Sequence, residues 1–197
     1  MTKVYLVRHG ETDWNRQGRI QGRENIPLNA NGLRQALYCG LYLKKFMPFA
    51  AVISSPLDRA RKTAEVIAET LEMKREIIIM NDLIERDFGE ISGLLPEERE
   101  LRLASGETLG IETQEDLRGR AMKALNTIST KFRGGGIIVV AHGAIINAML
   151  AVISGGKIGT RKTLLTNGGV SVVENSGERW SVELHDHIPA LPFSDIG

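Results

Sequence analysis

Short apolar runs and longer amphipathic stretches alternate along the chain, and the two patterns predict strands and helices in turn. Runs rich in β-branched residues predict strands at residues 3–7, 51–53, 76–80 and 137–140. Apolar residues at helical spacing predict helices at 31–46, from 54 to about 71, at 113–131 and after residue 142. A final pair of runs, separated by a turn at 175–178, predicts a hairpin of strands at 170–174 and 180–184.

This alternation predicts a three-layer α/β/α sandwich with a mainly parallel central sheet. A chain of 197 residues is long enough for one well-buried domain, so we expect residues 1–197 to form a single domain. At the start of the second helix, the sequence Ser54-Ser55-Pro56 predicts a serine cap followed by proline in the first turn. Residues 91–110 mix glycine, proline and charge, and we expect an excursion from the core there.

Charge, hydropathy and cysteine content argue against a nucleic-acid surface, a membrane span and an internal disulfide. The formal net charge is +1, which argues against a nucleic-acid surface as the main feature. The most apolar long window, 136–155, contains His142 and Asn147, so it predicts a buried strand and a helix rather than a membrane span. Cys39 is the single cysteine, which excludes an internal disulfide, and no charged-then-apolar leader precedes the first strand, so we expect a cytoplasmic protein.

Two of the four histidines directly follow or closely follow predicted strands. One lies in Arg8-His9-Gly10 and the other in Ala141-His142-Gly143. The carboxyl ends of the strands line the ligand crevice of an open α/β sheet, so we expect both histidines to face one pocket. A lone histidine after a strand is more often structural, but two of them accompanied by arginines favour a functional site.

Arg8 and Arg59 are the candidates for holding a phosphate group. A bound phosphate needs cations in fixed positions, and the planar guanidinium group matches two phosphate oxygens. Arg59 lies in the first turns of its predicted helix, where free backbone N–H groups and the helix dipole also favour an anion. Its neighbours Arg61 and Lys62 are more typical of a solvated helix face.

Four strings of residues carry a family resemblance over roughly residues 3–188. They are 8–32, which begins Arg8-His9-Gly10-Glu11-Thr12; 54–64, which contains Arg59; 83–90; and Ala141-His142-Gly143. Ser105-Gly106-Glu107-Thr108 is a weaker fifth. On these strings the chain resembles the histidine phosphatase superfamily, also called the phosphoglycerate-mutase-like family. The resemblance implies a phosphoglycerate-mutase-like α/β fold.

The resemblance also implies a role for each matching residue. His9 becomes the nucleophile that takes the phosphoryl group, and His142 becomes a phosphate ligand that stabilises charge during transfer. Arg8 and Arg59 become the catalytic phosphate ligands. Gly10 allows a close approach of the backbone to the histidine or the phosphate, and the alternative interpretation is a simple turn. The other expected phosphate contacts are Asn15, Gln21, Gly22 and Gly143.

The leaving alcohol needs a proton donor, because an ordinary alkoxide leaves poorly as an anion. Residues 83–90 offer several carboxylates. The family pattern, a Glu followed four residues later by Gly, selects Glu85 as the general acid, and Asp87 is the fallback if that register is wrong. Without the resemblance, an ion pair of Glu85 with a neighbour such as Arg86 would explain the residue as well.

A metal site is the weaker interpretation of these residues. The chain lacks His-x-x-x-His and Glu-x-x-His spacing, and arginines beside the histidines would repel a cation. We therefore expect neither a catalytic metal nor a cofactor. His185 and His187 can chelate as a pair, but they are more typical of a surface, and the resemblance suggests a structural role for His187.

Departures from the family concern the substrate rather than the phosphate. Ile91 and Ser92 stand where many members carry a bulky Trp-Glu pair, and the following stretch, 93–106, is short. Asn147 stands where many members have an arginine. With fewer contacts available to the rest of the substrate, we expect an open pocket with modest selectivity.

Three functions are weighed for this site. The first is a metal-independent phosphomonoester hydrolase that acts through a phosphohistidine on a small phosphorylated metabolite. The alternative is a phosphoglycerate mutase dependent on 2,3-bisphosphoglycerate, whose members carry a longer insertion near the acid, so the short segment here favours hydrolysis. A non-catalytic phospho-ligand binding module is the third, and the presence of the whole residue set disfavours it. The pattern identifies neither the physiological substrate nor the oligomeric state.

Overall fold

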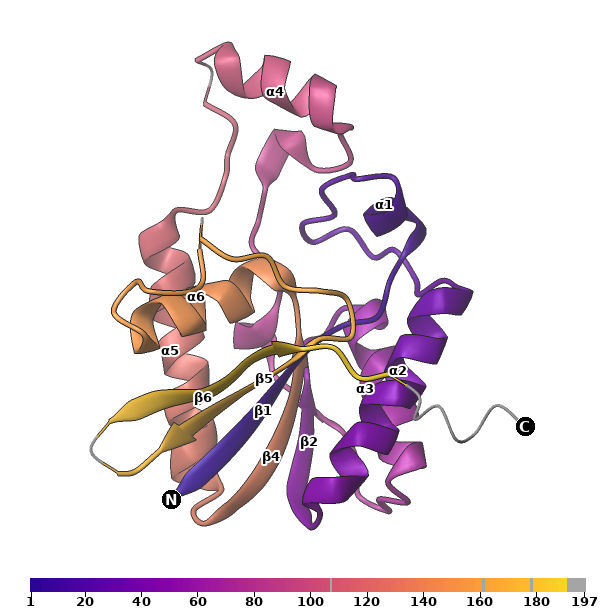
Figure 1. Cartoon of the computed structure of the whole chain (residues 1–197). Coiled ribbons are helices and arrows are strands. Elements are labelled where there is room, and N and C mark those ends of the chain that lie inside the picture. Colours follow the sequence, from indigo (N-terminus) through magenta and orange to yellow (C-terminus); the bar gives the residue numbers. More distant parts are fainter. Residues whose placement is uncertain (107, 161, 178, 191–197) are drawn as a thin grey trace.

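A mixed sheet of six strands organises the part of the chain that the structure describes (Figure 1). This structure is a computed structural model, and it describes residues 1–106, 108–160, 162–177 and 179–190. The strand order is β3-β2-β4-β1-β5-β6. The first four strands in this order run parallel, and β5 and β6 continue the sheet antiparallel beyond β1. The bounds are β1 Thr2–Arg8, β2 Phe49–Ser54, β3 Ile78–Ile79, β4 Gly135–Ala141, β5 Val170–Asn175 and β6 Trp180–His187.

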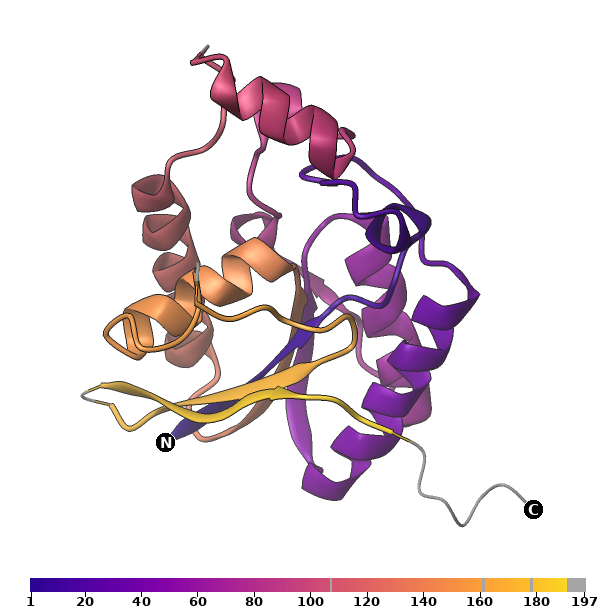
Figure 2. The same cartoon turned by 45° about the horizontal axis from the view of Figure 1, so that its top comes forward.

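Helices cover both faces of this sheet, as Figures 1 and 2 show. On one face lie α2 and α3, and on the other lie α5 and α6. The three-layer α/β/α sandwich predicted from the sequence is therefore confirmed. The α-helices are α1 Asp13–Arg16, α2 Ala30–Leu43, α3 Asp58–Thr70, α4 Pro96–Ala104, α5 Gln114–Lys131 and α6 Gly143–Ile153. Short 3-10 helices lie at Lys44–Phe46, Asn81–Leu83 and Gly89–Ile91.

The central strands are apolar on both faces because each face carries a helical layer. In β1, Val4 and Leu6 belong to the core cluster with α5 and α6, whereas Tyr5 and Val7 belong to the cluster with α2 and α3. This division follows from the strand period of two, which sends successive side chains to opposite faces. A parallel strand buried on both sides therefore gives a continuous apolar run, which is why β1 and β4 were easy to predict.

The start of α3 differs from the predicted serine cap. The helix begins at Asp58 and its capping position is Leu57, whose side chain makes no cap hydrogen bond. The chain is still extended at Ser54, the last residue of β2, so Ser55 lies too far from the helix to cap it. The Ser55 hydroxyl instead accepts a weak 3.4 Å bond from the Leu57 N–H and contacts His142. The predicted strand at 76–80 is also shorter than expected, because β3 pairs with the sheet only through Ile78 and Ile79.

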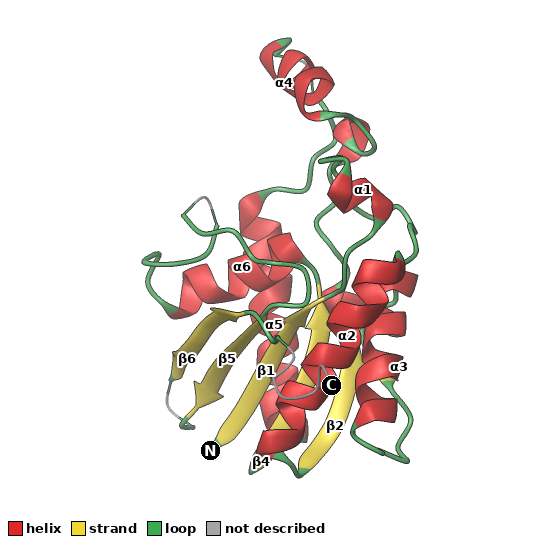
Figure 3. Ribbon diagram, turned by 45° about the vertical axis from the view of Figure 1, so that its right-hand side comes forward, coloured by secondary structure: helices red, strands yellow, loops and turns green. Residues whose placement is uncertain are grey.

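The segment 91–110 leaves the core, as its composition predicted, and it contains α4. In Figure 3 this helix stands apart from the sheet, on the same side as α1. The loop after α1 holds the chain just before α4. The Arg19 guanidinium donates to the Gly93 carbonyl at 2.6 Å, and the Gly93 N–H donates to the Ile20 carbonyl at 2.7 Å. Leu101 on this helix is 75% exposed. Glu107, part of the weaker fifth string, lies outside the described residues.

The apolar window 136–155 forms β4 and α6, as predicted. Ile137, Val139, Ile145 and Met149 of this window are fully buried in the core between the sheet and α5. Among the described residues, no helix combines the length and the apolar character needed to cross a membrane.

Candidate active site

Three neighbouring strands end at one point of the sheet. Arg8, the last residue of β1, lies opposite Ala141 at the end of β4, and β2 ends beside them at Ser54. His9 and His142 directly follow two of these ends. Their ring centroids are 5.1 Å apart, and both side chains are buried. The parallel register thus brings together two histidines that are 133 positions apart in the sequence.

His9 has a defined tautomer because both ring nitrogens have partners. Nδ1 lies 2.7 Å from the Gly10 carbonyl oxygen, which can only accept, so Nδ1 carries the proton. Nε2 accepts a 3.2 Å hydrogen bond from Arg59 Nε. Burial lowers the pKa of His9 well below its usual value, and the charges of Arg59 and Arg8 lower it further. The ring is therefore neutral near neutral pH, with its Nε2 lone pair directed at a guanidinium group.

His142 lies beside His9, with the Ser55 hydroxyl on its other side. Its Nε2 is 2.7 Å from the Ser55 hydroxyl, and its buried Nδ1 has no hydrogen-bond partner. Burial lowers the pKa of this histidine well below its usual value, and Arg59 and His9 lower it further. His142 is fully buried and does not line the cavity that His9 faces.

Arg59 is among the largest fully buried side chains of the described residues. Besides its bond to His9, its two terminal nitrogens donate to the Glu24 carbonyl at 2.6 Å and the Gly22 carbonyl at 2.8 Å. Burial lowers its pKa to about 10, so it stays charged at neutral pH. Gly22 adopts a left-handed backbone with φ of 52°, a conformation that glycine accepts without strain, and this turn directs its carbonyl to the arginine.

Arg8 brings a second guanidinium group to the same place from the end of β1. Its Nη1 donates to the Leu165 carbonyl, and its buried Nε has no hydrogen-bond partner. A Cβ added to Gly143 would lie 3.5 Å from that Nε, so the glycine leaves room beside the donor. A buried charged group with an unused N–H is a donor available to an anion.

Glu85 lies at the N-terminus of α6 and lines the same cavity. Its Oε1 accepts from the Arg86 and Ile145 N–H groups at 2.8 and 3.2 Å, and its Oε2 accepts from Ala144 at 3.1 Å. The fallback residue Asp87 accepts instead from the Gly89 N–H and pairs with an arginine at 3.3 Å, and it does not line the cavity. The geometry therefore favours Glu85 over Asp87 as the carboxylate beside the histidine.

A half-buried ion pair that no sequence motif indicated holds the backbone of Glu85. Arg120 of α5 donates to the carbonyls of Asp82, Ile84 and Glu85. Its guanidinium also binds Glu112 at 2.6 and 2.9 Å. Because the partners are spread from 82 to 120 in sequence, only the fold reveals that one arginine fixes this loop.

The loop after β1 is fastened by side chains around Asn15. The Asn15 amide oxygen accepts from Asn167 Nδ2 at 3.1 Å, and the same Nδ2 donates to the His9 carbonyl at 3.0 Å. Gln21 accepts from the Thr12 hydroxyl at 2.9 Å. Asn15 and Gln21 both line the cavity, as expected, whereas the role of Asn167 was not predicted from the sequence.

Gly10 and His187 both make packing contacts in the structure. A Cβ on Gly10 would lie only 2.3 Å from the Gly32 carbonyl oxygen, so Gly10 permits the loop to approach the backbone at the start of α2 rather than a phosphate. His187 stacks on Tyr42 with ring centroids 4.4 Å apart, which is a packing contact away from the cavity.

The cavity itself has a volume of about 560 Å³ and lies at the carboxyl ends of the strands. Arg8, Arg59, Arg19 and Arg99 all line it, and Arg99 comes from α4. The short segment 93–106 therefore does contribute a charged side chain to the cavity, which the sequence pattern did not predict.

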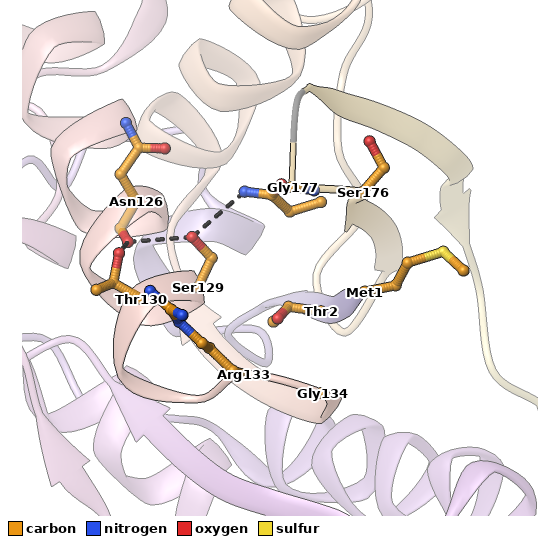
Figure 4. A pocket seen from close by; sticks show the side chains of 10 residues that line it. Met1, Thr2, Asn126, Ser129, Thr130, Arg133, Gly134, Ser176 and Gly177 are labelled. Carbon is orange, nitrogen blue, oxygen red and sulfur yellow. Dashed lines mark hydrogen bonds between the residues drawn. The ribbon is translucent and has the colours of Figure 1, made fainter.

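A cavity of about 530 Å³ lies at the other end of β1, lined by Met1, Thr2, Ser129 and their neighbours (Figure 4). Its described lining residues include Arg133 but no histidine or carboxylate. Ser129 is hydrogen-bonded to the Asn126 carbonyl at 3.1 Å. The chemistry of the molecule is therefore concentrated at the carboxyl end of the strands.

Comparisons with known proteins agree with this geometry. A family model described as the histidine phosphatase superfamily (branch 1) matches residues 4–187. An uncharacterised phosphatase, PhoE, of Bacillus subtilis is 43% identical over 183 residues, which cover 93% of each chain. A metal-independent phosphoserine phosphatase of Arabidopsis thaliana is 36% identical, over 100% of this chain and 85% of that protein.

Other similar proteins include both a mutase and a phosphatase. A probable phosphoglycerate mutase, GpmB, of Salmonella paratyphi A is 32% identical over 91% of this chain and 88% of that protein. The crystal structure of a phosphoserine phosphatase from Entamoeba histolytica in complex with 3-phosphoglyceric acid superposes with a TM-score of 0.81. It is 27% identical, and the match covers 95% of this chain and 98% of that one.

Proposed function

Because the chain belongs to the histidine phosphatase superfamily, we propose that it is a metal-independent phosphomonoester hydrolase that acts through a phosphohistidine at His9. The observation that carries this proposal is the neutral His9 ring, whose unprotonated Nε2 faces Arg59 in a cavity lined by a second arginine, Arg8. The similar phosphatases support it. The substrate is a small phosphorylated metabolite, and a cytoplasmic location is part of the same proposal.

In the first step, the substrate's phosphoryl group displaces the Arg59 contact to His9 Nε2 and is held by the two guanidinium groups. Nε2 then forms a bond to phosphorus while the bond from phosphorus to the alcohol oxygen breaks. The N–H at Nδ1 stays bonded to the Gly10 carbonyl, which keeps the ring oriented and stabilises the positive charge that the ring gains. Preorganised arginines stabilise the charge spread over the equatorial phosphate oxygens.

The departing alcohol oxygen takes a proton from Glu85. Water then attacks the phosphohistidine, and the same carboxylate accepts the water's proton, so Glu85 returns to its starting state. The products are the alcohol and inorganic phosphate. Arg8 and Arg59 supply fixed cations at the site, so the proposed steps need no metal ion.

The alternative is transfer of the phosphoryl group to a second alcohol rather than to water, as in a phosphoglycerate mutase. The similarity to a probable mutase keeps this alternative open. A mutase must keep water away from the phosphohistidine between the two transfers. An assay for 2- and 3-phosphoglycerate interconversion, primed with 2,3-bisphosphoglycerate, compares it directly with phosphate release.

The test of the proposed function is phosphate release from 4-nitrophenyl phosphate in the presence of a chelator. We expect activity to persist with the chelator, His9→Ala to abolish it, and acid-quenched enzyme to carry label from a labelled donor on His9. His187→Ala is the matched control, since that histidine lies away from the cavity. Loss of activity on chelation with recovery on adding a divalent metal, or label on a different residue, would contradict the proposal.

A further inference from the structure

A second cavity of about 390 Å³ adjoins the proposed phosphate site. Ala144, Asn147 and Leu164 line both cavities, so the two are contiguous. We call the second cavity the annex and define it by Gln114 at the start of α5, Asn147 of α6 and Thr160 of the following loop. A substrate whose phosphoryl group lies beside His9 could extend its non-phosphate part into this space.

Unpaired polar oxygens gather around the annex. Gln114 Oε1, Asn147 Oδ1 and Thr160 Oγ1 are buried and have no hydrogen-bond partner among the described residues. Folded proteins leave few buried polar atoms unpaired, so three of them around one cavity indicate that an occupant completes their hydrogen bonds. These oxygens are covered by neighbouring atoms. The Gln114 and Asn147 oxygens become accessible to an occupant when their carboxamides turn about the terminal torsion, which is broad.

Neutral hydroxyl groups match these three side chains. A carboxamide presents an acceptor at one end and a donor at the other, and a threonine hydroxyl does both. An alcohol hydroxyl also donates and accepts, so it pairs with each of them in either orientation. An aliphatic chain would leave all three oxygens unpaired, which is unfavourable in a buried site.

The charges around the annex disfavour an ammonium group. Arg86 and Lys162 are among its lining residues, and no aspartate or glutamate is among those described. Arg86 is already bonded to the Glu112 carbonyl, but it keeps its positive charge. An amino group carried by the substrate would therefore meet two cationic side chains, which repel it.

We propose that the annex binds the hydroxyl groups of the substrate's alcohol part, so that the preferred substrates are neutral polyol or sugar phosphates. This assignment rests on the phosphomonoesterase function proposed above. It differs from the amino-acid phosphate named for one of the similar proteins.

The test compares kcat/KM for ribitol 5-phosphate, propyl phosphate, phosphoserine and 4-nitrophenyl phosphate. We expect the polyol phosphate to exceed both propyl phosphate and phosphoserine by at least about tenfold, the size expected when hydrogen bonds to buried groups are satisfied. Thr160→Val and Gln114→Met should each remove most of this advantage, measured as the ratio of kcat/KM for ribitol 5-phosphate to kcat/KM for propyl phosphate. Thr127→Val, which removes an exposed hydroxyl elsewhere on α5, is the matched control.

Three results would overturn the assignment. Equal kcat/KM for ribitol and propyl phosphates would mean that water alone fills the annex, and a preference for phosphoserine would mean that the annex accepts an amino group. Unchanged preference in both annex variants, with melting temperatures like wild type, would place recognition elsewhere. A separate outcome concerns the proposed function itself. If neither 4-nitrophenyl phosphate nor any other phosphate ester of the panel is hydrolysed, the proposed function fails, and the annex assignment fails with it. The comparison among substrates on the wild-type protein stands even if a variant does not fold.

Discussion

At the scale of single residues, the site depends on which proton and which charge each side chain carries. The Gly10 carbonyl accepts the hydrogen bond from Nδ1 of His9, so Nε2 is the unprotonated nitrogen. Burial and then the adjacent guanidinium groups lower the pKa of the ring and keep it neutral. Glu85 is held by three backbone N–H groups beside the same cavity. The proposed nucleophile and the proposed proton carrier thus line one cavity, and separate hydrogen-bond networks orient them.

Glu85→Gln should damage hydrolysis of alkyl phosphates far more than that of 4-nitrophenyl phosphate. Glutamine cannot deliver a proton to the alkoxide, whereas nitrophenolate leaves without one, so we expect a loss of about 10²–10⁴-fold for the alkyl substrate only. The measurement is kcat/KM for both substrates, with Asp87→Asn as the control. Equal damage to both substrates would mean that Glu85 holds the start of α6 or activates water rather than protonating the leaving group.

The residues proposed to bear the chemistry lie in short, continuous strings, so the sequence alone can point to them. His9 and His142 directly follow β1 and β4, and the parallel register brings such positions together. The residues that hold them could not be predicted. Asn167 contacts the His9 carbonyl across 158 positions, and Arg120 reaches Glu85 across 35. No local pattern records a hydrogen bond between positions so far apart in the sequence.

Asn167→Ala should lower kcat about tenfold and change KM little. The amide donates to the His9 carbonyl and to Asn15, so its loss loosens the loop that aims the nucleophile without removing a phosphate contact. Steady-state kinetics with 4-nitrophenyl phosphate separate the two parameters. Asn175→Ala, at the end of β5, is the control. A rise in KM at unchanged kcat would instead make Asn167 part of substrate binding.

At the scale of secondary structure elements, the buried ones are the best predicted. β4 and α6 have a strong apolar signal because the sheet and α5 enclose them. α4 was not predicted. It is nine residues long, and Leu101 and Leu103 are exposed. A helix that packs so little against the core needs no regular spacing of apolar residues, so its sequence carries no clear helical pattern. β3 was predicted too long because it pairs at the sheet edge through two residues only. Prediction therefore succeeded where packing is dense, and it failed for α4 and for the length of β3.

Arg99→Ala tests whether α4 takes part in substrate binding. This arginine lines the catalytic cavity from outside the core, so it can attract a second anionic group on a substrate. We expect KM for 3-phosphoglycerate to rise about fivefold, which corresponds to roughly 1 kcal/mol for a solvated charge pair. KM for 4-nitrophenyl phosphate should change less than twofold, and Arg61→Ala on α3 is the control. An unchanged KM for 3-phosphoglycerate would show that α4 does not reach the bound substrate.

At the scale of the whole molecule, the fold buries two histidines among positive charges. His9 and His142 both have pKa values well below their usual value, because burial and the nearby arginines oppose protonation. The unfolded chain has no such environment, so its histidines protonate near pH 6.5. Between that pH and the lowered pKa values, the unfolded state binds more protons than the folded state. Stability must therefore fall as the pH drops below about 6.5.

The expected result is a loss of unfolding free energy of up to about 1.4 kcal/mol per pH unit for each histidine, between pH 6.5 and 5. Above about pH 7.5 the two histidines should contribute almost no slope, because they are then neutral in the unfolded chain too. Urea unfolding measured at several pH values gives the slope, and His142→Gln should reduce it by about half relative to the exposed His187→Gln. Inorganic phosphate should also reduce it, because an anion beside the rings favours their protonated form. A slope unaffected by His142→Gln would mean that carboxylates alone account for the acid sensitivity.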